Sequence, residues 1–144
     1  MTLERINVGD GIALGAAFRE TALLTALAGK ARPLVHNGVY RSYVLPPITL
    51  SGRTFRPSVY FTDGLLASVH LTWVDPKTEG GSAWEDFSFE RERSIAKEDA
   101  AWLSSYLRDV GSATSTYWFD WGTVWSGFDE RSGFSSIVVR YGHP

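Results

Sequence analysis

Hydrophobic and polar positions along the chain follow two periods, one typical of helices and one typical of strands. Residues 16–28 and 95–110 carry apolar side chains three and four positions apart, so each range predicts an amphipathic helix. Gly29 and Gly111 stand where these helices are expected to end, and Ser94 stands where the second is expected to begin. Most of the remaining chain favours β-structure.

Runs of Tyr, Val, Phe and Trp separated by turn residues predict a series of antiparallel strands. Asp63-Gly64 is the strongest hairpin signal, because a type I′ turn needs positive φ at both central residues. Asn37-Gly38 is a second turn signal, and Pro46-Pro47 predicts a strand that is split or lies at a sheet edge. The expected strands are 6–14, 39–45, 54–62, 66–74, 82–92, 116–126 and 134–141.

The same succession of elements, one helix followed by a run of strands, is expected twice along the chain. Residues 75–81 have the composition of a loop and divide the chain into halves, 1–80 and 81–144. Antiparallel strands with helices between them indicate the α+β class rather than a parallel sheet. We therefore predict one domain, residues 1–144, with an antiparallel β-sheet, two helices packed on one face and a tandem pseudo-repeat.

Alternation along the expected strands separates a core-facing phase from a second phase that collects large aromatic and charged side chains. Across 116–126, read as one strand, it places Trp125 in the core phase and Val124 in the second phase. Aromatic residues among charges resemble an interface more than a solvated surface, although Trp84 and Trp118 would equally cover one another or lie beneath a loop. The residues expected to bind a partner are Tyr60, His70, Trp84, Asp86, Glu90, Trp118, Asp120 and Arg140.

Composition limits the classes of function. The chain has 144 residues, 44% hydrophobic and 21% charged, which is typical of a folded domain. Its 14% aromatic content, with 6 Trp, favours contact surfaces. It has no cysteine, which excludes disulfides, thiolate zinc sites and cysteine nucleophiles and fits a reducing compartment.

Net charge and hydropathy limit the partners and the cellular location that we expect for this protein. The net charge is −2 and no basic block occurs, so we expect no nucleic-acid binding. We find no signal peptide and no apolar run near the ~20 residues needed to span a bilayer. The expected location is the cytoplasm, without membrane association.

The histidines offer little evidence of catalysis or metal binding. His36, His70 and His143 have no metal-ligand spacing, so we expect no metal site and no cofactor. His70 beside Asp86 or Asp120 would suit a general base. A solvent-facing strand histidine is the simpler interpretation, and we predict no catalytic residue.

Acidic residues leave a second interpretation open. Two carboxylates beside aromatic platforms would suit glycoside hydrolysis or sugar binding, whereas scattered acids more often keep a surface soluble or face a partner. The alternative function is therefore a carbohydrate or small-ligand binding protein, or a hydrolase, that uses the same face. The acids in question are Glu85, Asp86, Glu90, Asp120 and Asp129.

The C-terminal segment carries a recurring pattern, W-G-x-V-x-S-x-x-D, then a turn, then G-x-S-x-I-x-V-x-Y, over residues 121–129 and 133–141. This pattern resembles the ending of small bacterial immunity proteins, which are cytosolic antidotes to contact-dependent or type VI-delivered toxins. The helix-then-sheet duplication is also similar to β-lactamase-inhibitory proteins, in which a concave aromatic sheet grips an enzyme. The chain lacks the disulfides and the secretion signal of that second group.

These resemblances imply stoichiometric inhibition rather than catalysis. The partner would be a cognate toxin domain, with Trp and Tyr as anchors and the acids steering a basic toxin surface. A homodimer formed through the sheet is a further alternative.

Overall fold

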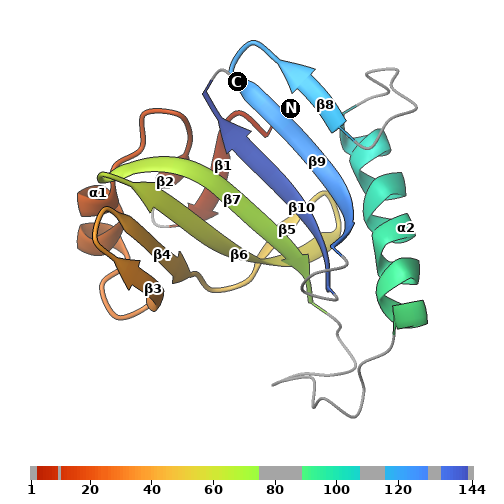
Figure 1. The fold of residues 1–144 in the computed structure, drawn as a ribbon, viewed down its shortest axis with the longest axis horizontal. Helices are drawn as coiled ribbons and strands as arrows, with labels where there is room; N and C mark the ends of the chain where they lie inside the picture. The colour runs from red at the N-terminus through yellow and green to blue at the C-terminus, as the bar shows by residue number, and fades with distance from the viewer. Residues whose placement is uncertain (1–2, 10, 75–88, 108–115, 130–133, 143–144) are drawn as a thin grey trace.

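The computed structural model describes residues 3–9, 11–74, 89–107, 116–129 and 134–142, and for Phe89, Asp129 and Phe134 it describes the backbone alone. Within these ranges the chain is mostly antiparallel β-sheet with two helices (Figure 1). This arrangement agrees with the predicted α+β class.

The N-terminal segment forms a small hairpin before the first helix. β1 (Ile6–Gly9) and β2 (Ile12–Leu14) pair antiparallel as a two-stranded sheet, so the predicted first strand is divided where Gly9 and Gly11 were expected to break it. α1 (Glu20–Ala26) is shorter than predicted, because Arg19 is extended and bridges Leu65 of the main sheet.

The first half of the main sheet contains β3 (Arg32–Asn37), β4 (Tyr40–Val44), β5 (Ile48–Leu50), β6 (Arg53–Thr62) and β7 (Leu65–Trp73). Asp63 and Gly64 have φ of 52° and 78°, as a type I′ hairpin requires, so that prediction is confirmed. Pro46-Pro47 divides the predicted strand into β4 and β5, which both pair with β6. β3 is not expected from the sequence, because Pro33 is typical of the region just after a helix.

The second half contains α2 (Phe89–Tyr106), β8 (Thr116–Phe119), β9 (Gly122–Asp129) and β10 (Phe134–Tyr141). The strand predicted over 82–92 is wrong for residues 89–92, which begin α2, while 82–88 lie outside the described residues. Ser94 lies inside the helix and is not its N-cap. The alternating Glu-Arg run suggests a strand, but both residue types are good helix formers, and Glu90 and Glu92 suit the positive end of the helix.

Residues 116–126, predicted as one strand, form the hairpin of β8 and β9, which turns at Asp120-Trp121. The reversal resets the alternation of side chains. Val124 is therefore buried in the core and Trp125 faces the other side, so the predicted phases of these two residues are wrong.

The main sheet has the strand order β3-β4-β6-β7-β10-β9-β8, with β5 beside β6. The two halves of the chain meet at the centre, where Leu71 and Val69 of β7 lie opposite Ile137 and Val139 of β10. Figure 1 shows the strands continuing side by side across this junction. The sheet is therefore one continuous surface built from both halves.

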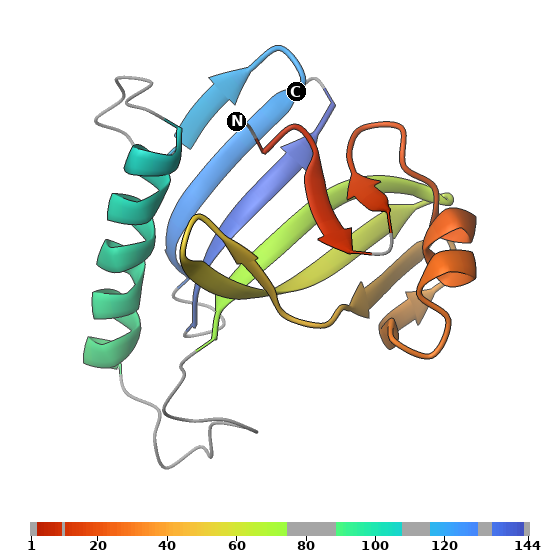
Figure 2. The ribbon, with the colours of Figure 1, turned by 180° about the vertical axis from the view of Figure 1, so that it is seen from behind.

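The hydrophobic core lies against one phase of these strands. Figure 2 shows β1, β2, α1 and β5 in front of the sheet on this side. Leu3 and Leu14 from the N-terminal segment, Leu23 from α1 and Leu103 from α2 are each 0% exposed. The fully buried strand residues that they join are Phe55, Val59, Val69, Leu71, Val124, Ile137 and Val139.

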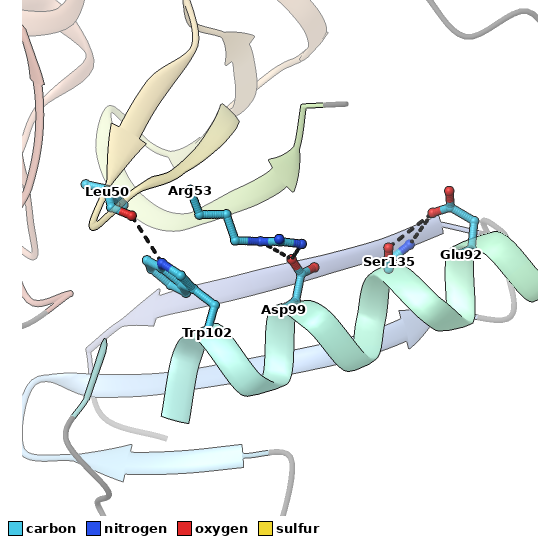
Figure 3. A network of polar contacts seen from close by, with 6 residues as sticks. All are labelled: Leu50, Arg53, Glu92, Asp99, Trp102 and Ser135. Carbon is cyan, nitrogen blue, oxygen red and sulfur yellow. Dashed lines mark hydrogen bonds and ion pairs between the residues drawn. The ribbon is translucent and has the colours of Figure 1, made fainter. Parts of the chain in front are cut away.

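Polar contacts fix α2 in place (Figure 3). Arg53 Nη2 and Nε donate to Asp99 Oδ1 at 2.7 and 3.0 Å. Trp102 Nε1 donates to the Leu50 carbonyl at 3.1 Å. Ser135 donates through its backbone N–H and its hydroxyl to a carboxylate oxygen of Glu92. The helix is thus joined to the β5–β6 hairpin and to the start of β10. Arg53 and Ser135, which take part in these polar contacts, share the core-facing phase of their strands with Phe55, whose ring packs against that of Trp102.

Candidate functional site

The side chains opposite the core form two rows that cross the main sheet, and we call them together the outer face. The strand register defines both rows, because residues paired across antiparallel strands point to the same side. The first row is Ser42, Tyr60, Ser68, Arg140, Thr123 and Trp118. The second row is Arg32, Val44, Ser58, His70, Val138, Trp125 and Thr116. Arg56 and Thr72 extend the same phase beyond the second row.

Aromatic side chains stand at both sides of the outer face. Trp118 is 66% exposed, the largest exposure of any large hydrophobic residue in the described part of the chain. Tyr60 and His70 lie together, with ring centroids 4.4 Å apart, and both are half-buried. Trp125 is half-buried and covers Gly127, so the two sides of the face differ in how far their rings project.

The charges of the outer face are basic. Arg140 lies at the centre of the first row, and Arg32 and Arg56 lie toward the margins of the outer face; all three are exposed. Apart from Asp129 of β9, whose side chain lies outside the described part, no strand position of this phase in the described ranges carries a carboxylate. Asp63 and Asp120 lie beyond it, in the hairpin turns.

The structure brings together half of the residues predicted for a binding face. Tyr60, His70, Trp118 and Arg140 share the outer face, as the alternation of side chains predicted. Their role in binding stays a prediction. Trp84 and Asp86 lie outside the described residues.

Two acidic residues predicted for this face are elsewhere. Glu90 belongs to the first turn of α2 and not to a strand, so its placement on the sheet is wrong. Asp120 is exposed in the β8–β9 turn rather than within a strand. The start of α2 and the β8–β9 turn lie at opposite ends of the view in Figure 1, so these carboxylates do not form a pair. Glu85 and the side chain of Asp129 lie outside the described part.

Sequence reasoning missed Trp125 as a member of the outer face. The error came from reading β8 and β9 as one strand. Gly122 was the signal that could have found it, since a glycine inside an apparent strand often marks a turn or a bulge.

Burial changes the pKa of two ionisable groups on this face. It raises the pKa of Tyr60. It also lowers the pKa of His70, and the charge of Arg140 lowers it further. The imidazole of His70 is therefore neutral at neutral pH, which leaves the arginines as the source of positive charge.

The lowered pKa of His70 predicts a loss of stability in mild acid. Below a pH of about 6.5 the unfolded chain binds a proton at His70, whereas the folded protein binds it only at lower pH. The free energy of unfolding should therefore fall as the pH falls through this window. Urea unfolding at neutral and mildly acidic pH checks this. His70→Gln should reduce the fall.

The contact between Trp125 and Gly127 predicts a second effect. A Cβ at position 127 would lie 2.7 Å from Cζ2 of the Trp125 ring. The indole is the far end of a side chain, so we expect Gly127→Ala to tilt it away from β9 at a cost of roughly 1 kcal/mol. Tryptophan fluorescence should change with little loss of stability. Unchanged fluorescence would show that the ring does not lie over this glycine.

The described residues contain neither a candidate metal site nor a candidate membrane-spanning helix. In these ranges no group of three or more His, Asp or Glu side chains is placed to hold a metal ion. Neither α1 nor α2 has the length and hydropathy to cross a bilayer.

No protein-family model, curated protein or solved structure matches the chain with significant similarity.

Proposed function

We propose that this protein is a cytoplasmic immunity or inhibitor protein that binds a cognate bacterial toxin through the outer face and neutralises it without catalysis. The observation that carries the proposal is the exposure of Trp118 in the same row as Arg140, with Thr123 between them, on a continuous sheet. Trp, Tyr and Arg are the residues that most often dominate the binding energy of protein interfaces. The C-terminal sequence pattern supports the class of toxin antidotes.

The arrangement of the helices also supports this proposal. Phe18, just before α1, contacts Phe61 with ring centroids 6.3 Å apart, and Trp102 of α2 contacts Phe55 at 4.9 Å. Phe55 and Phe61 both alternate with outer-face residues along β6. We infer that both helices pack on the core side of the sheet and leave the outer face to a partner.

A duplicated architecture would make this surface rigid. In our proposal the two halves are pseudo-repeats, each a helix followed by antiparallel strands, that join through β7 and β10. A surface held by the ladders of both halves loses little conformational entropy on binding, which favours tight inhibition. The acids predicted to steer the toxin take no part in the described outer face, so the proposal relies on the aromatic residues and Arg140.

Toxin neutralisation tests the proposal. The probe is the C-terminal domain encoded by the gene beside this one, expressed in bacteria with and without this protein. Wild type should restore growth. The double variant Trp118→Ala, Trp125→Ala should bind that domain about 100-fold more weakly, since two anchor residues are removed.

Leu34→Ala is a matched control, because Leu34 is 48% exposed on β3 and lies outside the rows of the outer face. It should protect like wild type. Circular dichroism and urea unfolding of each variant separate loss of binding from loss of fold. Full protection by the double variant, or binding of oligosaccharides instead of protein at these indoles, would contradict the proposal.

A further inference from the structure

The three arginines of the outer face have no anionic partner among the described residues. Arg140 is exposed at the centre of the first row, between Ser68 of β7 and Thr123 of β9. Arg32 and Arg56 are also exposed on the same side. In the described ranges none of the three forms an ion pair or a side-chain hydrogen bond.

A partner that covers this face would bury the guanidinium of Arg140. Removing a charged group from water costs free energy unless an opposite charge and hydrogen bonds replace the water. The neighbours of Arg140 across the strands are hydroxyl residues, and the ring of His70 is neutral at neutral pH. Since the described part of the chain places no carboxylate beside Arg140, we expect the compensating anion to come from the partner.

We infer that the surface bound by the outer face is an acidic protein surface, with a carboxylate that pairs with Arg140 between the Tyr60 side and the Trp118 side. This inference rests on the proposed function and reverses the charge expected from the sequence. Arginine suits this role, because its planar guanidinium binds a carboxylate through two parallel hydrogen bonds while its faces stack on aromatic rings.

A protein surface fits the charges better than a nucleic acid does. A polyanionic strand binds mainly by releasing counterions, and three arginines supply few phosphate contacts. Asp63 and Asp120 at the hairpin turns would repel a strand that continued past the ends of the face. The net charge of −2 would weaken its approach further. A carboxylate patch of limited size avoids both sources of repulsion.

Synthetic polymers test this inference without knowledge of the natural partner. The probes are a random copolymer of glutamate and tyrosine, a copolymer of lysine and tyrosine, and oligothymidylate. Binding to the full-length protein is followed by tryptophan fluorescence and by NMR signals of the Arg140 Nε–H and Trp118 Nε1–H groups. We expect the glutamate–tyrosine copolymer to bind best, with both signals shifted, and its affinity to fall as salt rises.

Variants of Arg140 and Trp118 distinguish a requirement for the positive charge of Arg140 from a requirement for the outer face as a whole. Arg140→Gln should weaken binding of the glutamate–tyrosine copolymer about tenfold, and Arg140→Lys should weaken it less. Lys97→Gln, at an exposed lysine of α2, is the matched control and should bind like wild type. Trp118→Ala should weaken binding of whichever tyrosine copolymer binds.

Each result has a defined meaning. Preference for the lysine–tyrosine copolymer, equal binding by Arg140→Gln, or no binding of the acidic copolymer would overturn the inference. Preference for oligothymidylate would assign the face to nucleic acid instead. A loss in Trp118→Ala without a loss in Arg140→Gln would leave the binding face in place and remove only its charge assignment. Loss in neither variant would count against the proposed function as well.

Discussion

Replacing Arg53 with alanine is expected to lower the free energy of unfolding by about 3–5 kcal/mol, because it leaves the buried carboxylate of Asp99 without its counter-charge. The side chains of Arg53 and Asp99 are 13% and 0% exposed, and Asp99 Oδ2 has no hydrogen-bond partner. The guanidinium also packs 5.0 Å from the ring centroid of Trp73. Urea unfolding at neutral pH measures the loss.

The pH dependence of the stability of Arg53→Ala is a second test of the Arg53–Asp99 ion pair. Burial raises the pKa of Asp99, and the contacts with Arg53 oppose that rise. Without Arg53 the pKa should rise further, so the folded variant holds a proton that the unfolded chain releases. Its stability should therefore recover as the pH falls through the folded pKa toward the lower pKa of the unfolded chain. A variant equally unstable at both pH values would contradict this account.

Two further variants define the cost of the buried pair. Arg41→Ala removes a side chain that is 47% exposed and lies 3.7 Å from Glu20, and it should cost less than about 1 kcal/mol. The double variant Arg53→Met, Asp99→Leu should regain most of the stability lost in Arg53→Ala, because it removes both charges together. A double variant as unstable as Arg53→Ala would show that packing of the arginine over Trp73, and not charge, supplies the stability.

The parts of the fold that follow from the sequence are those with local and unambiguous signals. The Asp63-Gly64 turn requires positive φ at two adjacent residues, and it fixes the hairpin of β6 and β7. The core phase of β10 was also assigned correctly, since Ile137 and Val139 are both 0% exposed, although Val138 between them on the other face is buried as well. β3 lacks such a signal, because all six of its residues are exposed and only its pairing with β4 makes it a strand.

The candidate site was predictable only where the strands were correctly divided. Tyr60, His70 and Arg140 lie in strands whose limits the turn residues define, and their side chains share one face as expected. Trp125 was assigned to the core, because one unrecognised turn reverses every later side chain in the hairpin. The sign of the charge on the face could not be predicted from the sequence either. Glu90 was expected at an outward strand position, whereas it lies in the helix α2.

The observed positions of Glu90 and Trp125 both change the composition of the outer face. Moving Glu90 to α2 takes negative charge away from the outer face, and Arg140 then becomes the central charge. Moving Trp125 onto the face adds an indole two strands from His70, with Val138 between them. The residues gained are those that interfaces favour, and the residue lost is one that interface centres disfavour.

Replacing Gly122 with alanine is expected to cost about 3 kcal/mol or more, because it combines backbone strain with a clash against β10. Gly122 has φ of 154°, and a Cβ there would overlap the carbonyl oxygen of Arg140 and lie 2.9 Å from its carbonyl carbon. The clash involves backbone, so a change of side-chain rotamer cannot relieve it. Urea unfolding measures the loss, and NMR signals of Arg140 and Trp118 should shift as β9 moves from β10.

Gly142→Ala is the control that separates strain from contact. Gly142 also has positive φ, 101°, but a Cβ there would meet nothing within 4 Å, so its substitution should cost only the backbone strain, roughly 1 kcal/mol. Because Arg140 and Thr123 are paired beside Gly122, the Gly122 variant should also bind the partner less tightly, although every binding side chain is retained. Equal losses in the two glycine variants would show that β9 and β10 do not approach closely at this point, and the register that pairs Arg140 with Thr123, in the same row as Trp118, would then be wrong.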